Sequence, residues 1–307
     1  MKTSRKEITR LLFDTLWGKY IERVSYAKKY SDLVIKKGGK IVFDHIAFRT
    51  LNSHTGEQPE GIRAIKHILN FLDYKPVSEY NFSKKKLKAF HFEHPDELFP
   101  KIFVSQLEVS KLPGWAQTAI NKTVKNTPYL LSDRSIGLLR SLEENGDLPV
   151  EAAEYLIKDL VQYFRRPWNI PQKDDVLKIN DVTQYGAWVL LHGNSVNHFA
   201  AYINYQNVKE WPDLETTCKG LANSGIPMKE EIEGERGSKL RQSATQAVKE
   251  EVKVKTDGGI EKITWTSAYL ELTERNHFTE NGTTKLFTGF LGAQATHLFD
   301  MTQTHDN

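Results

Sequence analysis

Two segments of the sequence each carry one histidine in a strand-like run, and the same order of elements follows both. The first histidine, His45, lies in segment 41–50, and the second, His198, lies in segment 197–204. This repeat of element order predicts an α+β fold built from two βαβββ-like halves. The segments that follow are a helix over 60–73 and strands over 74–80, 88–93 and 101–108 in the first half, and a helix over 214–224 and strands over 252–256 and 263–275 in the second.

Helical patterns lie outside this repeat. Apolar residues at helical spacing from Lys6 to Tyr30 predict one long amphipathic helix. A further helical block over 110–165, broken by Gly-Asp-Leu-Pro at 146–149, is expected to be an insertion or cap within a single domain that spans residues 1–307. The tail 289–302 predicts a short closing helix.

Composition excludes several classes of protein. The 307 residues are 39% hydrophobic and 26% charged, which is typical of a globular chain, and a net charge of +3 gives no reason to expect a nucleic-acid partner. The polar N-terminus and the lack of an 18-residue apolar run predict neither a signal peptide nor a membrane-spanning helix. The single cysteine, Cys218, excludes an internal disulfide and a cysteine zinc finger, and favours a cytoplasmic location.

Any metal must therefore be bound by histidine, aspartate or glutamate. Glu271 lies between Leu270 and Leu272 in a strand-like segment, and an acid in such a place needs a partner because burial of an isolated charge is costly. His45, His198 and Glu271, from three strands, could form a 2-His-1-carboxylate set that leaves coordination positions open. The alternative is that each histidine is a hydrogen-bonded core residue.

Five groups of residues, in order along the chain, resemble landmarks of the DUF1338 family. That family is similar to the vicinal-oxygen-chelate, or glyoxalase-like, superfamily, and it includes the iron-dependent 2-oxoadipate dioxygenase/decarboxylase of lysine degradation. The resemblance covers roughly residues 41–302. The groups are His45-Ile46-Ala47-Phe48-Arg49; Ala187-Trp188 with Gly193 and Asn197-His198-Phe199; Gln242-Ser243-Ala244-Thr245; Tyr269-Leu270-Glu271-Leu272-Thr273-Glu274-Arg275; and Gly289-Phe290 with Ala295, Leu298-Phe299 and Thr302.

The resemblance implies that the two βαβββ-type halves curl into a glyoxalase-like incomplete β-barrel around an Fe(II) site formed by His45, His198 and Glu271. It also implies an activity, the O2-dependent oxidative decarboxylation of a 2-oxo acid such as 2-oxoadipate to 2-hydroxyglutarate and CO2. Glu271 is preferred to Glu274 as the ligand because Tyr269-Leu270-Glu271-Leu272 also resembles the metal-bearing last strand of glyoxalase-type enzymes. Strand alternation then places Glu271 and Thr273 on one face and Glu274 on the other. Glu274 is expected to point outward or to pair with a basic group.

The resemblance further implies residues that contact the substrate. Arg49 matches the family's substrate-binding arginine, and its planar fork suits a carboxylate; the alternative is a surface salt bridge. Gln242, Ser243 and Thr245 match a Gln-Ser-Ser-Thr motif of the family, with Ala244 in place of a serine. The alternative for this motif is a polar turn before a pair of strands.

Two other classes of function stay open. A His2Glu set with an open position also suits zinc, which would make the protein a hydrolase or a glyoxalase-type isomerase or lyase. A catalytically silent binding protein could also keep the fold. His192 and Asn197 flank His198, and either could fix the tautomer of its ring.

Overall fold

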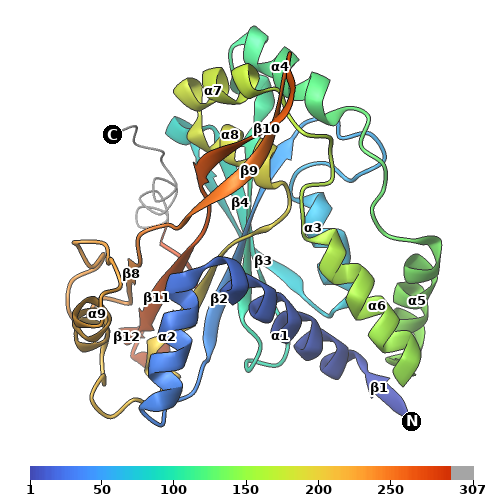
Figure 1. The fold of residues 1–307 in the computed structure, drawn as a ribbon. Helices are drawn as coiled ribbons and strands as arrows, with labels where there is room; N and C mark the ends of the chain where they lie inside the picture. Colours follow the sequence, from blue (N-terminus) through green and yellow to red (C-terminus); the bar gives the residue numbers. More distant parts are fainter. Residues whose placement is uncertain (292–307) are drawn as a thin grey trace. The chain divides into compact units, whose positions relative to one another are not determined.

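The computed structural model describes residues 1–291, which are drawn as a coloured ribbon in Figure 1. These residues fall into two compact units. The first unit comprises residues 1–19, 47–196 and 250–265. The second comprises residues 20–46 and 197–249, together with the described residues from 266 onward. Strand β2 (Phe43–Asn52) begins in the second unit and ends in the first. The single domain over residues 1–307 remains a prediction.

The first unit contains the predicted first half of the repeat, which is confirmed. Its strands are hydrogen bonded in the order β3-β4-β5-β2, and β4 is antiparallel to both neighbours that flank it. The helix between β2 and β3 buries one apolar face, which includes Ile65 and Ile68. The elements that follow β2 are α3 (Arg63–Phe71), β3 (Lys75–Phe82), β4 (Leu87–Glu93) and β5 (Lys101–Glu108), with short 3-10 turns η1 (Ser83–Lys85) and η2 (Val109–Lys111).

The predicted helical block also belongs to the first unit. Its helix α5 ends at Gly146, whose positive φ of 76° suits glycine, and the Gly146 amide donates to the carbonyl of Leu142 at 2.9 Å. The block consists of α4 (Gly114–Val124), α5 (Asp133–Asn145), β6 (Asp147–Pro149) and α6 (Val150–Tyr163), and β6 pairs with β1 (Lys2–Ser4). Two further helices, α7 (Lys173–Val182) and α8 (Gln184–His192), follow it. Among the helices within residues 1–291, none combines the length and the apolar character needed to cross a bilayer.

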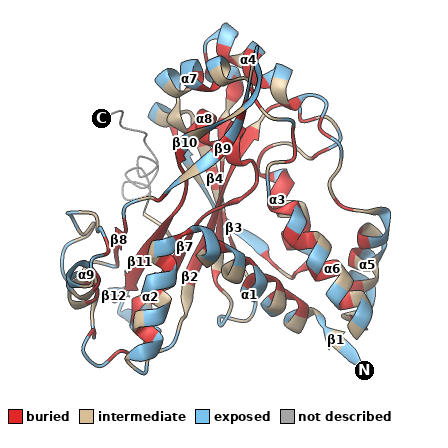
Figure 2. Cartoon of the chain, in the orientation of Figure 1, coloured by how far each residue is buried: buried red, intermediate tan, exposed pale blue. Residues whose placement is uncertain are grey.

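The second unit contains strands in the order β2-β7-β11-β8. Strand β7 (Val196–Tyr202) runs parallel to β11 (Tyr269–Arg275), and β8 (Leu240–Ala244) runs antiparallel to β11. Strands β7 and β11 are buried over nearly all of their length (Figure 2). The same unit includes η3 (Ile203–Tyr205), helix α9 (Leu214–Asn223) and the hairpin β12 (His277–Glu280) and β13 (Thr283–Leu286).

The second half differs from the predicted order of elements. The sequence pattern predicts no strand over Leu240–Ala244, where Arg241, Gln242 and Ser243 are polar, yet all five residues are buried in β8. The predicted strand 252–256 corresponds to β9 (Lys249–Thr256), which pairs with β10 (Gly259–Thr266) in a separate two-stranded hairpin. The predicted strand 263–275 is therefore two strands, β10 and β11. The predicted closing helix lies mostly outside the described residues.

The single long N-terminal helix is a wrong prediction. The chain forms α1 (Arg5–Arg23) and α2 (Ser25–Lys36), and the backbone of Val24 between them leaves the helical region at φ −103° and ψ 87°. Valine differs from good helix formers by well under about 1 kcal/mol, so local sequence does not mark this break. Tyr20, one turn earlier, donates its hydroxyl to the carbonyl of Tyr269 at 2.5 Å, a long-range contact that a sequence pattern does not reveal.

Gly193, between α8 and β7, should be the most sensitive glycine of the first unit. It has φ 61° and ψ −132°, and a Cβ there would lie 2.3 Å from the Cα of Arg166. We expect Gly193→Ala to lower the free energy of unfolding by about 2–4 kcal/mol, through backbone strain and overpacking. Chemical denaturation measures this change.

Gly137 provides the matched control, because it lies inside α5 and a Cβ there would meet no atom within 4 Å. Gly137→Ala should raise the free energy of unfolding by roughly 0.5–1 kcal/mol. Equal effects of the two substitutions would show that backbone strain and overpacking do not make Gly193 sensitive.

Candidate metal centre

Three buried side chains meet on one face of the strands in the second unit. His45 comes from β2, His198 from β7 and Glu271 from β11. In the parallel pair β7–β11, Glu271 lies opposite Ala200, which shares a face with His198 through strand alternation. The backbone register therefore places the carboxylate beside the second histidine, and the predicted convergence of the three residues is observed.

The possible ligand atoms of these residues all lie within 4.8 Å of one another. The two Nε2 atoms of His45 and His198 are 3.2 Å apart. Glu271 places Oε1 3.5 Å from Nε2 of His45 and Oε2 3.3 Å from Nε2 of His198. The exposed fractions of His45, His198 and Glu271 are 2%, 6% and 0%. The set is thus a compact, dry cluster of nitrogen and oxygen donors.

Hydrogen bonds on the far side of each ring determine which nitrogen carries the proton. Nδ1 of His45 lies 2.8 Å from Oδ2 of Asp44, and Nδ1 of His198 lies 3.0 Å from Oδ1 of Asn197. Both oxygens are acceptors, so each Nδ1 is the protonated donor and each neutral ring keeps a lone pair on Nε2. The two lone pairs therefore face each other inside the protein.

The remaining oxygen of the carboxylate supports the same interpretation. Within residues 1–291, Oε2 of Glu271 accepts no hydrogen bond, although it is fully buried. An orphaned carboxylate oxygen is rare in a core because it costs free energy. Two Nε2 lone pairs and this oxygen point at one small region, and a bound cation would satisfy all three. The residues thus fit a metal ion.

Neighbouring side chains orient the Glu271 carboxylate. Nε2 of Gln242 and Oγ1 of Thr273 both donate to Oε1, the latter at 3.2 Å. Burial raises the pKa of Glu271 to about 7, and the hydrogen bond from Thr273 opposes this shift only in part. The site therefore contains a carboxylate that is costly to ionise until a positive charge is placed beside it.

A second buried ion pair lies behind His45. Arg275 donates from Nε to Oδ1 of Asp44 at 2.5 Å and from Nη2 to Oδ2 at 2.9 Å. Burial alone would raise the pKa of Asp44, but the charge of Arg275 and hydrogen bonds from His45 and Arg275 hold it well below its usual range. The acceptor for Nδ1 of His45 is therefore a carboxylate anion.

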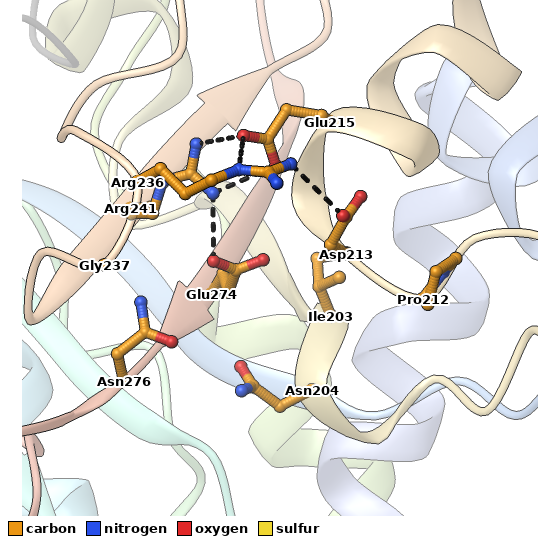
Figure 3. A pocket seen from close by; sticks show the side chains of 10 residues that line it. All are labelled: Ile203, Asn204, Pro212, Asp213, Glu215, Arg236, Gly237, Arg241, Glu274 and Asn276. Atoms are coloured by element: carbon orange, nitrogen blue, oxygen red, sulfur yellow. Dashed lines mark hydrogen bonds and ion pairs between the residues drawn. The ribbon is translucent and has the colours of Figure 1, made fainter.

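Glu274 lies on the opposite face of β11, as strand alternation predicts. It accepts from Nη1 of Arg241 at 3.1 Å and from the backbone amide of Leu214 at 2.9 Å. Arg241 also binds Glu215, and these groups line a cavity of about 310 Å³ in the second unit (Figure 3). Glu274 therefore belongs to an ion-pair network away from the metal face.

Arg49 is buried in the first unit, so the alternative of a surface salt bridge is wrong. Only 2% of it is exposed, and its guanidinium carbon lies 5.1 Å from the ring centre of Tyr185 and 5.3 Å from that of Trp188, both on α8. The Tyr185 hydroxyl accepts from the amide of Thr50 at 3.1 Å and bonds the hydroxyl of Ser105 at 2.9 Å. Arg49 is thus held by cation–π contacts to rings that are themselves fixed.

The first three residues of the Gln-Ser-Ala-Thr motif lie on β8 rather than in a turn, and Thr245 directly follows the strand. Gln242 and Ala244 pair with Thr273 and Glu271 and share their face, whereas Ser243 pairs with Leu272 on the other face. The Thr245 hydroxyl accepts from the amide of Leu270 at 3.1 Å and donates to the carbonyl of Gln246 at 2.9 Å. The motif therefore places Gln242 against Glu271.

Of the two polar residues that flank His198 in the sequence, Asn197 contacts its ring, as noted above. His192 lies in the first unit, 3.3 Å from Glu250 and stacked at 4.7 Å on Trp188. Sequence reasoning did not find Asp44 and Arg275, because a pair separated by 231 residues leaves no local signal.

Comparison with solved structures identifies the class of protein first. The chain is similar to a protein of Ralstonia eutropha JMP134 described as a member of the glyoxalase superfamily, with 26% identity, a TM-score of 0.86 and coverage of 94% of this chain and 87% of that one. The fold is therefore glyoxalase-like, as predicted, and it carries a buried His-His-Glu cluster able to hold a metal.

A family model that matches most of the chain identifies the particular family. A family model described as 2-oxoadipate dioxygenase/decarboxylase matches residues 19–306, and the chain belongs to this family, the DUF1338 family. A relative from Oryza sativa named 2-oxoadipate dioxygenase/decarboxylase, chloroplastic/amyloplastic, is 26% identical over 190 residues, which are 58% of this chain and 45% of that protein. The match thus spans less than half the length of the rice relative.

A second solved structure shares the fold at lower identity. It is the hydroxyglutarate synthase of Oryza sativa in complex with 2-oxoadipate, with 21% identity, a TM-score of 0.74 and coverage of 97% of this chain and 93% of that one. At this identity the likeness shows the fold.

The two carboxylates of β11 should respond differently to the loss of charge. Glu271→Gln removes the anion from the cluster, so we expect metal content to fall at least about tenfold while the fold is retained. Glu274→Gln should keep the metal and lose about 1–3 kcal/mol of stability, because Arg241 loses one of its carboxylate partners. Elemental analysis and thermal melting of both purified variants measure these effects. If Glu271→Gln kept the metal and Glu274→Gln lost it, the ligand would be Glu274, on the opposite face of β11 from the one proposed.

Proposed function

We propose that the protein is an Fe(II)-dependent dioxygenase that decarboxylates a 2-oxo acid such as 2-oxoadipate. The observation that carries this proposal is the cluster of His45, His198 and Glu271, in which two Nε2 lone pairs and an orphaned carboxylate oxygen converge. Membership of a family described as 2-oxoadipate dioxygenase/decarboxylase supports the reaction. The rice hydroxyglutarate synthase, whose structure holds 2-oxoadipate, supports the substrate class.

The donor set favours Fe(II). Two imidazoles and one carboxylate leave open positions and are the ligands of non-haem iron oxygenases. Bound there, Fe(II) would supply positions for a chelating 2-oxo acid and O2, together with the electrons that activate O2. The overall reaction balances without a further reductant, because 2-oxoadipate and O2 contain the atoms of 2-hydroxyglutarate and CO2.

The residues of the chain would bind and orient the substrate. Arg49 follows His45 by four residues on β2, and on a regular strand such positions share a face. Its fork would bind the distal carboxylate of a 2-oxo diacid, and the rings of Tyr185 and Trp188 would keep that fork in one orientation. Gln242, Ser243 and Thr245 remain proposed substrate contacts, and Gln242 would also hold Glu271.

The compartment also remains a proposal. The single cysteine favours a reducing compartment such as the cytoplasm. The rice relative carries a chloroplastic/amyloplastic designation in its name.

Oxygen consumption tests the proposed reaction. Protein purified anaerobically and loaded with Fe(II) should consume one O2 for each CO2 released from 2-oxoadipate and should form 2-hydroxyglutarate. Glu271→Gln, given the same iron, is the matched control and should be inactive. Two results together would instead support the hydrolase or glyoxalase-type alternative. Zinc-loaded wild-type protein would turn over a substrate without O2, and iron-loaded protein would consume no O2.

Arg49→Lys tests the substrate role. Lysine keeps the charge but loses the planar fork, so we expect kcat/KM for 2-oxoadipate to fall roughly 10- to 100-fold, equivalent to about 1.5–3 kcal/mol. A monocarboxylic 2-oxo acid of similar length should lose much less. Equal losses for the two acids would show that Arg49 does not recognise the distal carboxylate.

A further inference from the structure

The two histidines of the metal centre are held from behind by groups of different charge. Each is preceded in sequence by the residue that accepts a hydrogen bond from its Nδ1, Asp44 for His45 and Asn197 for His198. The acceptor is a carboxylate in one case and a neutral amide in the other. The backbone arrangement is therefore repeated in β2 and β7, while the electrostatics are not.

Arg275 explains how the carboxylate can be buried. Asp44 is 4% exposed and Arg275 is 1% exposed, and two guanidinium nitrogens contact the two carboxylate oxygens. This bidentate arrangement fixes the plane of the carboxylate as well as its charge. Oδ2 of Asp44 is shared between Arg275 and the ring of His45, so the position of the guanidinium determines where the imidazole hydrogen bond is made.

The same guanidinium also contacts the segment that follows β13. Nη1 of Arg275 donates to the carbonyls of Phe287 at 3.2 Å and Gly289 at 2.7 Å. The ring of Phe290 then lies edge-on to His45, with ring centres 5.0 Å apart, and 5.2 Å from the guanidinium carbon of Arg275. Arg275 therefore restrains His45 on two sides, through Asp44 and through Phe290.

We propose that Asp44 and Arg275 are positioning residues of the metal centre, which hold His45 as an Nε2 ligand and make it a stronger donor than His198. The inference rests on the proposed metal centre. A carboxylate hydrogen bonded to Nδ1 draws the proton away from the ring and raises the basicity of Nε2, whereas an amide oxygen does so less. Arg275 fixes the plane of that carboxylate through its bidentate contact, and so would act on the metal through Asp44 and His45.

Two variants test the pair, and one matched variant controls for loss of a buried arginine. Asp44→Asn makes the acceptor behind His45 resemble that behind His198, and Arg275→Lys keeps the charge but removes the bidentate contact. Arg241→Lys is the control, since Arg241 is also buried and paired with a β11 carboxylate, Glu274, on the other face. Circular dichroism and thermal melting of the metal-free proteins establish that each variant is folded.

Metal affinity is the first measurement. Co(II) is titrated against a competing chelator and followed by its visible absorption. We expect Asp44→Asn to bind Co(II) about 10- to 100-fold more weakly than the wild type, and Arg275→Lys to show a smaller loss. Arg241→Lys should bind Co(II) as the wild type does, even if it melts at a lower temperature.

The second measurement is proton nuclear magnetic resonance of the zinc-loaded protein, and its main comparison is made between two histidines of the wild type. The Nδ1 proton of His45, bonded to a carboxylate, should resonate at lower field than that of His198, bonded to an amide. In Asp44→Asn the His45 signal should move toward that of His198. If the variants fail to fold, the wild-type comparison of the two signals decides the question.

The outcomes separate this inference from the function on which it rests. Folded variants with wild-type Co(II) affinity, or equivalent Nδ1 signals for the two histidines, would overturn the positioning role and leave the metal centre intact. Wild-type protein that binds no Co(II) would overturn the metal centre, and the positioning role with it.

Discussion

The stability of the second unit depends on how its strands compensate the buried carboxylate of Glu271. A carboxylate with no exposed surface is stable only with partners, because desolvation of an isolated anion costs several kcal/mol. Gln242 and Thr273 donate to one oxygen, Oε1, and the other, Oε2, lies 3.3 Å from Nε2 of His198. A cation bound among these groups would compensate the charge of the carboxylate.

Strand alternation separates this chemistry from ordinary structural ion pairing. On β11, Glu271, Thr273 and Arg275 face the histidines, while Glu274 faces Arg241 and the start of α9. Each face has its own buried arginine and its own carboxylate partner. One strand of seven residues thus supplies Glu271 and the groups that support the cluster on one side, and a partner in a structural ion pair on the other.

The first unit contributes a different kind of preorganisation. Arg49 is held against two aromatic rings of α8, and the Tyr185 ring is fixed in turn by Thr50 and Ser105. A guanidinium held in this way loses little conformational entropy when it binds a carboxylate, because its orientation is already restricted. Burial of the arginine therefore favours a recognition role over a role in surface stability.

Local pattern determined much of this protein without its tertiary structure. Period-2 alternation and the repeat of element order were sufficient for β2, β3, β4, β5 and β7, and strand alternation was sufficient to place Glu271 and Glu274 on opposite faces of one strand. The resemblance of ordered motifs was sufficient for the fold and for the expectation that His45, His198 and Glu271 converge. These features survive in sequence because they depend on neighbours within a few residues, or on motifs that keep their order.

Only the tertiary structure decided the rest. It broke the N-terminal helix at Val24, buried the polar strand β8 and joined Asp44 to Arg275 across 231 positions. Each of these depends on a partner far away in the chain: a packed neighbour, a strand that accepts the hydrogen bonds of β8, or an opposite charge in the core. Such pairings are stable only when the whole fold brings both partners out of water together, so no local property of either residue reveals them.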